Sequence, residues 1–153
     1  MLKRDRFVLH KSVLYDAFSN YECDHKETAI KLLRHLFLQK MKGYHIAVIP
    51  GELFHRIYEK FKDLPGGTML ISKLRDITDI DFSMVSEGGK RLDIDDAVKK
   101  QASLENVRPD NGKVFIVDNN TQSGMSNGVY TINSTQALEM VQHPNFKKFR
   151  VCE

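Results

Sequence analysis

Side chains that can bind a metal ion or move a proton cluster around the short apolar runs of this 153-residue chain. They stand at the end of an apolar run or near the start of a predicted helix: His10, Glu52, His55, Asp93, Asp95, Asp96, Asp118 and Asn120. Carboxylates are the ligands that Mg²⁺ prefers, and a metal held by them can activate water. Imidazoles suit Zn²⁺ and other transition metals. The sequence therefore offers donors for two kinds of metal chemistry, if the fold brings them together.

The elements that must position these side chains alternate between strands and helices. Short apolar runs predict strands over 7–9, 45–49, 77–85, 114–117 and 129–132. Apolar residues at three- and four-residue spacing predict helices over 25–41, 51–61, 68–75, 92–104 and 133–141. The run 114–117 carries no charge, which is typical of a strand buried on both faces.

Alternating strands and helices predict an α/β fold of three layers, α/β/α, with a mostly parallel central sheet of about five strands. No linker or internal repeat interrupts the pattern, so residues 1–153 are expected to form a single domain. Its core would span about 6–141, followed by a basic tail over 144–153. Ligands of such sheets bind beyond the carboxyl ends of the strands, where His10 and Asp118 stand.

The charge is unevenly distributed along the chain. Residues 1–75 carry a formal charge of +6 and residues 76–153 carry −3, which together give the net +3. A basic half suits a protein that contacts a polyanion, although scattered surface charge gives the same numbers. The candidates for phosphate contact are basic residues near the first strand and in the tail, namely Arg6, Lys11, Lys147 and Lys148.

The sequence also indicates a compartment. No run of 18 apolar residues is present, so no membrane span is expected, and the charged N-terminus lacks the apolar core of a signal peptide. Cys23 and Cys152 form no CxxC pair, which argues against a zinc ribbon or a disulfide scaffold. We therefore expect a reduced, intracellular location in the cytoplasm.

The order of elements and several local patterns resemble a PIN-like domain, the fold of many small metal-dependent ribonucleases and flap nucleases. The resemblance covers about residues 6–141. The stretch 7–14 is similar to the family's first strand, which ends in an Asp-Thr-Asn-Val-Leu type of motif, and 117–120 is similar to its last acidic motif. Asp95, with Val98 and Ala102 behind it, fits the spacing of the acid that opens a helix in that family.

The resemblance also shows where this chain departs from the family. His10, His55 and Asn120 stand at three of the four positions where the family has acids, and only Asp95 is retained. An active site would then need displaced carboxylates and Mg²⁺ or Mn²⁺. Its catalytic residues would be Asp95, Asp118 and Glu52. A site made of His10, His55, Asp95 and Asn120 would instead suit Zn²⁺ or another transition metal.

Three functions follow as expectations. The first is a nucleic-acid-associated protein, with RNA favoured over DNA, in which an altered and inactive nuclease site serves binding or regulation. The second is an active metal-dependent ribonuclease of the toxin type. The third is a protein-interaction module, with a protein partner or a second copy of the chain, that touches no nucleic acid, since fold alone does not choose among them.

Overall fold

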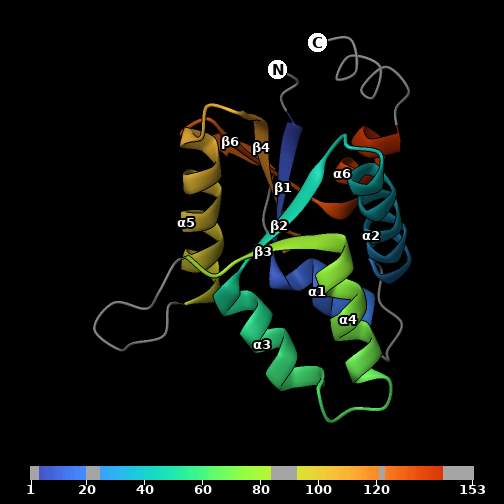
Figure 1. The fold of residues 1–153 in the computed structure, drawn as a ribbon. Helices are drawn as coiled ribbons and strands as arrows, with labels where there is room; N and C mark the ends of the chain where they lie inside the picture. The colour runs from blue at the N-terminus through green and yellow to red at the C-terminus, as the bar shows by residue number, and fades with distance from the viewer. Residues whose placement is uncertain (1–3, 20–24, 84–92, 121–122, 143–153) are drawn as a thin grey trace.

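The computed structural model describes residues 4–19, 25–83, 93–120 and 123–142, and shows a six-stranded sheet with helices on both faces (Figure 1). The strands are β1 (Arg4–Leu9), β2 (Ile46–Pro50), β3 (Thr78–Asp81), β4 (Asn111–Val117), β5 (Gly124–Ser126) and β6 (Val129–Ile132). The helices are α1 (Lys11–Phe18), α2 (Lys26–Met41), α3 (Gly51–Phe61), α4 (Gly67–Ile77), α5 (Ile94–Val107) and α6 (Ser134–Gln142). The predicted α/β class is confirmed.

The sheet has the order β3-β2-β1-β4-β6-β5, and every neighbouring pair is parallel except β5 with β6. Helix α5 covers one face, while α2 and α6 cover the other (Figure 1). Helices α1 and α3 begin where β1 and β2 end, so they lie at the carboxyl edge of the sheet. This is the three-layer arrangement that the alternating pattern predicts.

The sheet has six strands where the sequence pattern predicted about five. The additional strand, β5, forms a hairpin with β6 through Asn127 and Gly128, whose φ angles are +54° and +82°. An Asn-Gly pair with positive φ at both positions makes the tight turn that joins antiparallel strands. All three β5 residues are exposed, so this strand lacks the apolar run by which the others were predicted.

The core lies between the two central strands and the helices packed on them. Phe7, Val8 and Leu9 of β1 are fully buried, and the Phe7 ring stacks on Phe115 of β4 at 5.1 Å between centroids. In β4, Ile116 is only partly buried, unlike its neighbours, because it faces an open cleft beside α5. The expectation of burial on both faces therefore holds for Val114, Phe115 and Val117 but not for Ile116.

The start of α6 is fixed by its own sequence. Asn133 Oδ1 accepts the backbone N–H of Gln136 at 2.8 Å, and Gln136 Oε1 accepts the backbone N–H of Asn133 at 2.9 Å. This reciprocal pair is a capping box. The basic tail 144–153 lies outside the described residues, and no helix within the described ranges has the length and apolarity needed to cross a membrane.

Candidate functional site

A cleft of about 440 Å³ opens at the carboxyl edge of the sheet, between β1, β4 and the first turns of α5. His10, Lys11, Asp95, Asp118 and Asn120 line it, all of which the sequence singled out. We call it the carboxyl-edge cleft. The fold therefore brings together residues that lie more than 100 positions apart in the chain, as expected for the ends of adjacent parallel strands.

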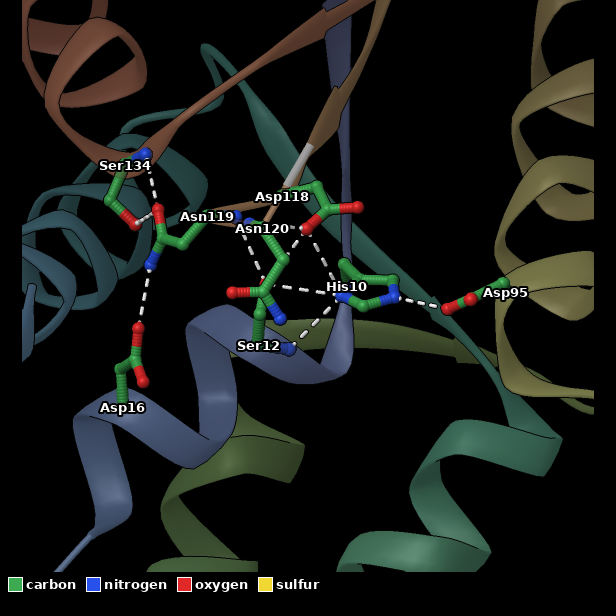
Figure 2. A network of polar contacts seen from close by, with 8 residues as sticks. All are labelled: His10, Ser12, Asp16, Asp95, Asp118, Asn119, Asn120 and Ser134. Carbon is green, nitrogen blue, oxygen red and sulfur yellow. Dashed lines mark hydrogen bonds and ion pairs between the residues drawn. The ribbon is translucent and has the colours of Figure 1, made fainter. Parts of the chain in front are cut away.

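His10 is held at both nitrogens of its ring. It occupies the N-cap position of α1, where Nδ1 accepts the backbone N–H of Ser12 at 3.1 Å. An acceptor role for Nδ1 places the proton of the neutral imidazole on Nε2. From there Nε2 donates to Oδ1 of Asp95 at 2.5 Å (Figure 2). The ring thus links the end of β1 to the start of α5.

Asp95 stands in the first turn of α5, where the unpaired amides of the helix favour a negative charge. Its side chain is 60% exposed, so Asp95 is the solvent-accessible member of the pair with His10. The hydrogen bond from His10, and more weakly the nearby Lys11 and Lys99, hold the pKa of Asp95 below its usual value. Asp95 is therefore a carboxylate at neutral pH, and its charge is compensated within the protein.

Asp118 follows β4 and is buried at the inner end of the cleft, with 8% of its surface exposed. Its Oδ1 accepts the hydroxyl of Ser12 at 3.1 Å and the backbone N–H of Asn120 at 2.9 Å. The same oxygen lies 3.4 Å from Nδ1 of His10. The Ser12 hydroxyl in turn accepts the backbone N–H of Asn119 at 3.0 Å. These bonds fix the loop after β4 against the start of α1 (Figure 2).

Asn119 extends the network further along α1 and to the start of α6. Its side-chain amide donates to Asp16 of α1 at 3.0 Å, and its carbonyl accepts the backbone N–H and the hydroxyl of Ser134 at 2.9 and 2.8 Å. Figure 2 shows Asn119 between α1 and the start of α6. Sequence reasoning did not identify Ser12, Asp16, Asn119 or Ser134. A signal was present for Asn119, because it lies between two candidates directly after a strand.

Ser12, His10 and Asp95 together have the composition of a nucleophile, a base and an orienting carboxylate. The Ser12 hydroxyl lies 3.1 Å from Nδ1 of His10. However, Ser12 is buried, is not among the residues that line the cleft, and already donates to Asp118. In this geometry the serine supports the fold of the loop rather than facing a substrate.

The other predicted site residues lie elsewhere. His55 is exposed on α3, where its ring contacts Phe82 at 5.8 Å between centroids, and neither His55 nor Glu52 is among the residues lining the carboxyl-edge cleft. Arg6 points into a different cleft, described below. Lys147 and Lys148 lie outside the described residues. In the opposite direction, the structure adds Lys99, one helical turn after Asp95 and on the same face of α5.

The donor set does not fit a metal ion in this arrangement. Within the described ranges, no group of three or more His, Cys, Asp or Glu side chains is placed to hold one. The reason is visible in the contacts: both nitrogens of His10 and Oδ1 of Asp118 are already engaged by protein groups. A metal ion here would have to separate His10 from Asp95.

No protein-family model, curated protein or solved structure matches this chain. The chemistry of the carboxyl-edge cleft therefore has to be inferred from its own side chains. These are an internally paired histidine and carboxylate, a buried second carboxylate, and two lysines at the margin.

Proposed function

We propose that this chain is a PIN-like protein that binds nucleic acid, RNA in preference to DNA, through the carboxyl-edge cleft without hydrolysing it. The observation that carries the proposal is the contact between His10 and Asp95. It stands where the resemblance to the family places metal-binding acids. An imidazole there takes the place of one carboxylate and hydrogen-bonds to the acid that remains.

The charge of the cleft supports this proposal. Four carboxylates would repel a phosphate unless a metal ion neutralised them. Here Asp95 is hydrogen-bonded to His10, and the positive charges of Lys11 and Lys99 line the same cleft. Lysines at such positions contact the phosphate backbone and position the strand without reading its sequence. The preference for RNA rests on the resemblance to a family rich in ribonucleases.

Labelled single-stranded RNA and single- and double-stranded DNA test the proposal in filter-binding and gel-cleavage assays. The purified chain is incubated with Mg²⁺, Mn²⁺ or Zn²⁺, or with a chelator, at about 50 and 200 mM salt. We expect binding that weakens steeply with salt, is tightest for RNA, and leaves the strands intact. Lys99→Gln should weaken binding, whereas Lys100→Gln, an exposed neighbour outside the cleft lining, should not.

The second candidate function is a metal-dependent ribonuclease, favoured by the fact that Asp95 and Asp118 both line the cleft. Metal-dependent cleavage that disappears in Asp95→Ala would establish that function and overturn the first. If neither binding nor cleavage is found, both proposals fail and the protein-interaction module is left.

A further inference from the structure

A second cleft, of about 690 Å³, lies on the other side of α5, over β1, β2 and β3. Four cationic side chains from four different elements line it: Arg6 from β1, Lys40 from α2, Arg75 from α4 and Arg108 at the end of α5. Val48 and Ile80 contribute apolar surface. We call it the arginine cleft. Its volume is within the range of clefts that bind small molecules.

The carboxylates of the arginine cleft are already paired within the protein. Asp79 accepts from Lys40 at 3.3 Å, and Asp81 lies 3.4 Å from Arg108. Burial opposes the charge of Asp81, but hydrogen bonds from Ser83 and Gln101, together with Arg108, keep its pKa below the usual value. With Glu105, which also pairs with Arg108, three carboxylates and four cations line the cleft, an excess of one positive charge. Lys40 and Arg108 are the cations that these acids pair with.

Glu105, only 2% exposed, organises the floor of the cleft. One of its oxygens accepts from Arg108 at 3.1 Å and from Gln101 at 3.2 Å, and the other accepts from Asn111 at 2.7 Å. Asn111 in turn accepts Nε of Arg6 at 2.9 Å. A buried polar network with its partners in place fixes the orientation of its members. The Arg6 guanidinium is thus held by Nε, and its two terminal nitrogens remain for other contacts.

Arg6 and Arg75 have no carboxylate partner among the residues that the structure describes. Arg4 stands two positions before Arg6, on the same face of β1. Burial, and then the charge of Arg6, lower the pKa of Arg4. Its Nη2 is buried and has no hydrogen-bond partner within the described ranges. Guanidinium groups without a carboxylate partner that line one cleft, as Arg6 and Arg75 do, attract an anion, and a phosphate matches their fork of donors.

Two aromatic rings lie near Arg75, although neither is among the residues that line the cleft. The Arg75 guanidinium lies 5.6 Å from the centre of the Phe54 ring, and Phe82 packs edge-on against Phe54 at 6.0 Å. Phe82 is 53% exposed and stands in the chain between Asp81 and Ser83, which both line the cleft. An exposed ring beside a cationic cleft offers a surface on which a nucleobase can stack.

We propose that the arginine cleft binds a nucleoside monophosphate, with the phosphate on Arg6 and Arg75 and the base toward Phe82. The ligand is either a free nucleotide or the 5′-phosphorylated end of a nucleic acid, since both present the same group. This site lies on the opposite side of α5 from the carboxyl-edge cleft. It does not depend on whether that cleft binds nucleic acid.

Isothermal titration of the full chain tests the proposal with inorganic phosphate, ribose 5-phosphate, adenosine monophosphate, and a short RNA carrying either a 5′-phosphate or a 5′-hydroxyl. We expect adenosine monophosphate to bind more tightly than ribose 5-phosphate. Arg6→Gln should weaken the binding of adenosine monophosphate roughly tenfold. Arg6→Lys should weaken that binding less, because lysine keeps the charge but loses the bidentate fork. In Phe82→Ala, adenosine monophosphate should bind no more tightly than ribose 5-phosphate.

Two further variants keep the test independent of folding. Arg75→Gln lies outside the buried network and should weaken binding on its own, while Arg34→Gln, an exposed arginine of α2 that does not line the cleft, should not. Tighter binding of the 5′-phosphorylated RNA than of its 5′-hydroxyl form supports the proposal and identifies the ligand as a nucleic-acid end. If the two RNAs bind equally and adenosine monophosphate also binds, the proposal is supported and the ligand is identified as a free nucleotide. No binding of any phosphate, or equal binding by Arg6→Gln and the unmodified chain, overturns it.

Discussion

The two clefts beside α5 both contain carboxylates and cations, but they pair them differently. In the carboxyl-edge cleft the acids Asp95 and Asp118 are held by His10, Ser12 and backbone amides. In the arginine cleft the acids are held by cations, and Arg6 and Arg75 are left over. The dipole of α5 favours both arrangements. Asp95 lies at the start of the helix, where a negative charge is favoured, and Arg108 lies at its end, where a positive charge is favoured.

This difference shows what position in the fold does and does not determine. The ends of parallel strands place polar side chains together, so a site at that edge is expected for the fold. The arginine cleft has no such rule behind it, because it is built from the middle of β1, the ends of three helices and the edge strand β3. Its cations meet only in the folded chain.

The buried network of the arginine cleft gives the largest expected effect. Glu105→Ala removes an acceptor from Arg108, Gln101 and Asn111 at once and leaves Asp81 and the backbone carbonyl of residue 105 as their remaining acceptors. We expect the free energy of unfolding in urea to fall by about 3 kcal/mol. Glu139→Ala, which removes an exposed carboxylate from α6, is the control. A loss of stability no greater than that of the control would mean that the network does not hold the cleft.

The carboxyl-edge cleft offers a matched pair of neighbouring residues. Asn119 makes three side-chain hydrogen bonds that join α1 and α6, whereas the exposed Asn120 donates its backbone N–H to Asp118, a bond that does not need the Asn120 side chain. Asn119→Ala should therefore cost about 2 kcal/mol of stability, and Asn120→Ala less than about 0.5 kcal/mol. Chemical denaturation of both variants measures the difference. Equal losses would show that the loop is not fixed by the Asn119 side chain.

Much of the fold could be predicted because most of its strands coincide with apolar runs in the sequence. The class, the layers and the central strands follow from that pattern alone. Strand β5 did not, because its exposed residues carry no such run, although Asn127-Gly128 is a strong turn signal. Helix α1 was also missed, since its eight residues are too few to display a clear helical repeat.

The candidate site could be predicted only in part. His10, Asp95 and Asp118 could be grouped from the positions of strand ends and helix starts, but nothing in the sequence says that His10 and Asp95 bind each other. The placement of His55 depends on the direction in which α3 leaves β2, and that is a tertiary property. The arginine cleft joins Arg6, Arg75 and Arg108 across the chain, and no local pattern links them.

Placing a carboxylate at the end of β1 would sharpen the contrast between the two clefts. In His10→Asp three carboxylates meet at the carboxyl-edge cleft, and their mutual repulsion should lower stability by about 1 kcal/mol in the presence of a chelator. Mn²⁺ should then raise the melting temperature of the variant and not of the unmodified chain. Only the variant has the third carboxylate to bind the ion, and an ion that binds the folded state stabilises it.

His55→Asp is the control for that experiment, since it adds the same charge on the exposed surface of α3, outside the lining of the cleft. Mn²⁺ should leave its melting temperature unchanged. A rise of equal size in both variants would show that added negative charge attracts the ion at any place on the surface.

The smallest expected effect is the pH dependence of the pair between His10 and Asp95. The pKa of Asp95 is lowered in the folded chain, chiefly by the hydrogen bond from His10. A carboxylate with a lowered pKa stabilises the fold fully above its unfolded value of about 4, and that contribution is lost as the pH falls through the lower, folded value. The melting temperature of the unmodified chain should therefore exceed that of Asp95→Asn above about pH 5, and by less as the pH falls below about 4.

The effect is small because the Asp95 side chain is 60% exposed and water screens its charge. Asparagine keeps an acceptor for Nε2 of His10, so the comparison isolates the charge from the hydrogen bond. Asp96→Asn removes a carboxylate from the same exposed turn with no contact to His10. If the two variants respond to pH alike, the turn as a whole carries the dependence. If Asp95→Asn alone responds, the imidazole at the end of β1 sets the charge of this cleft, as guanidinium groups set that of the other.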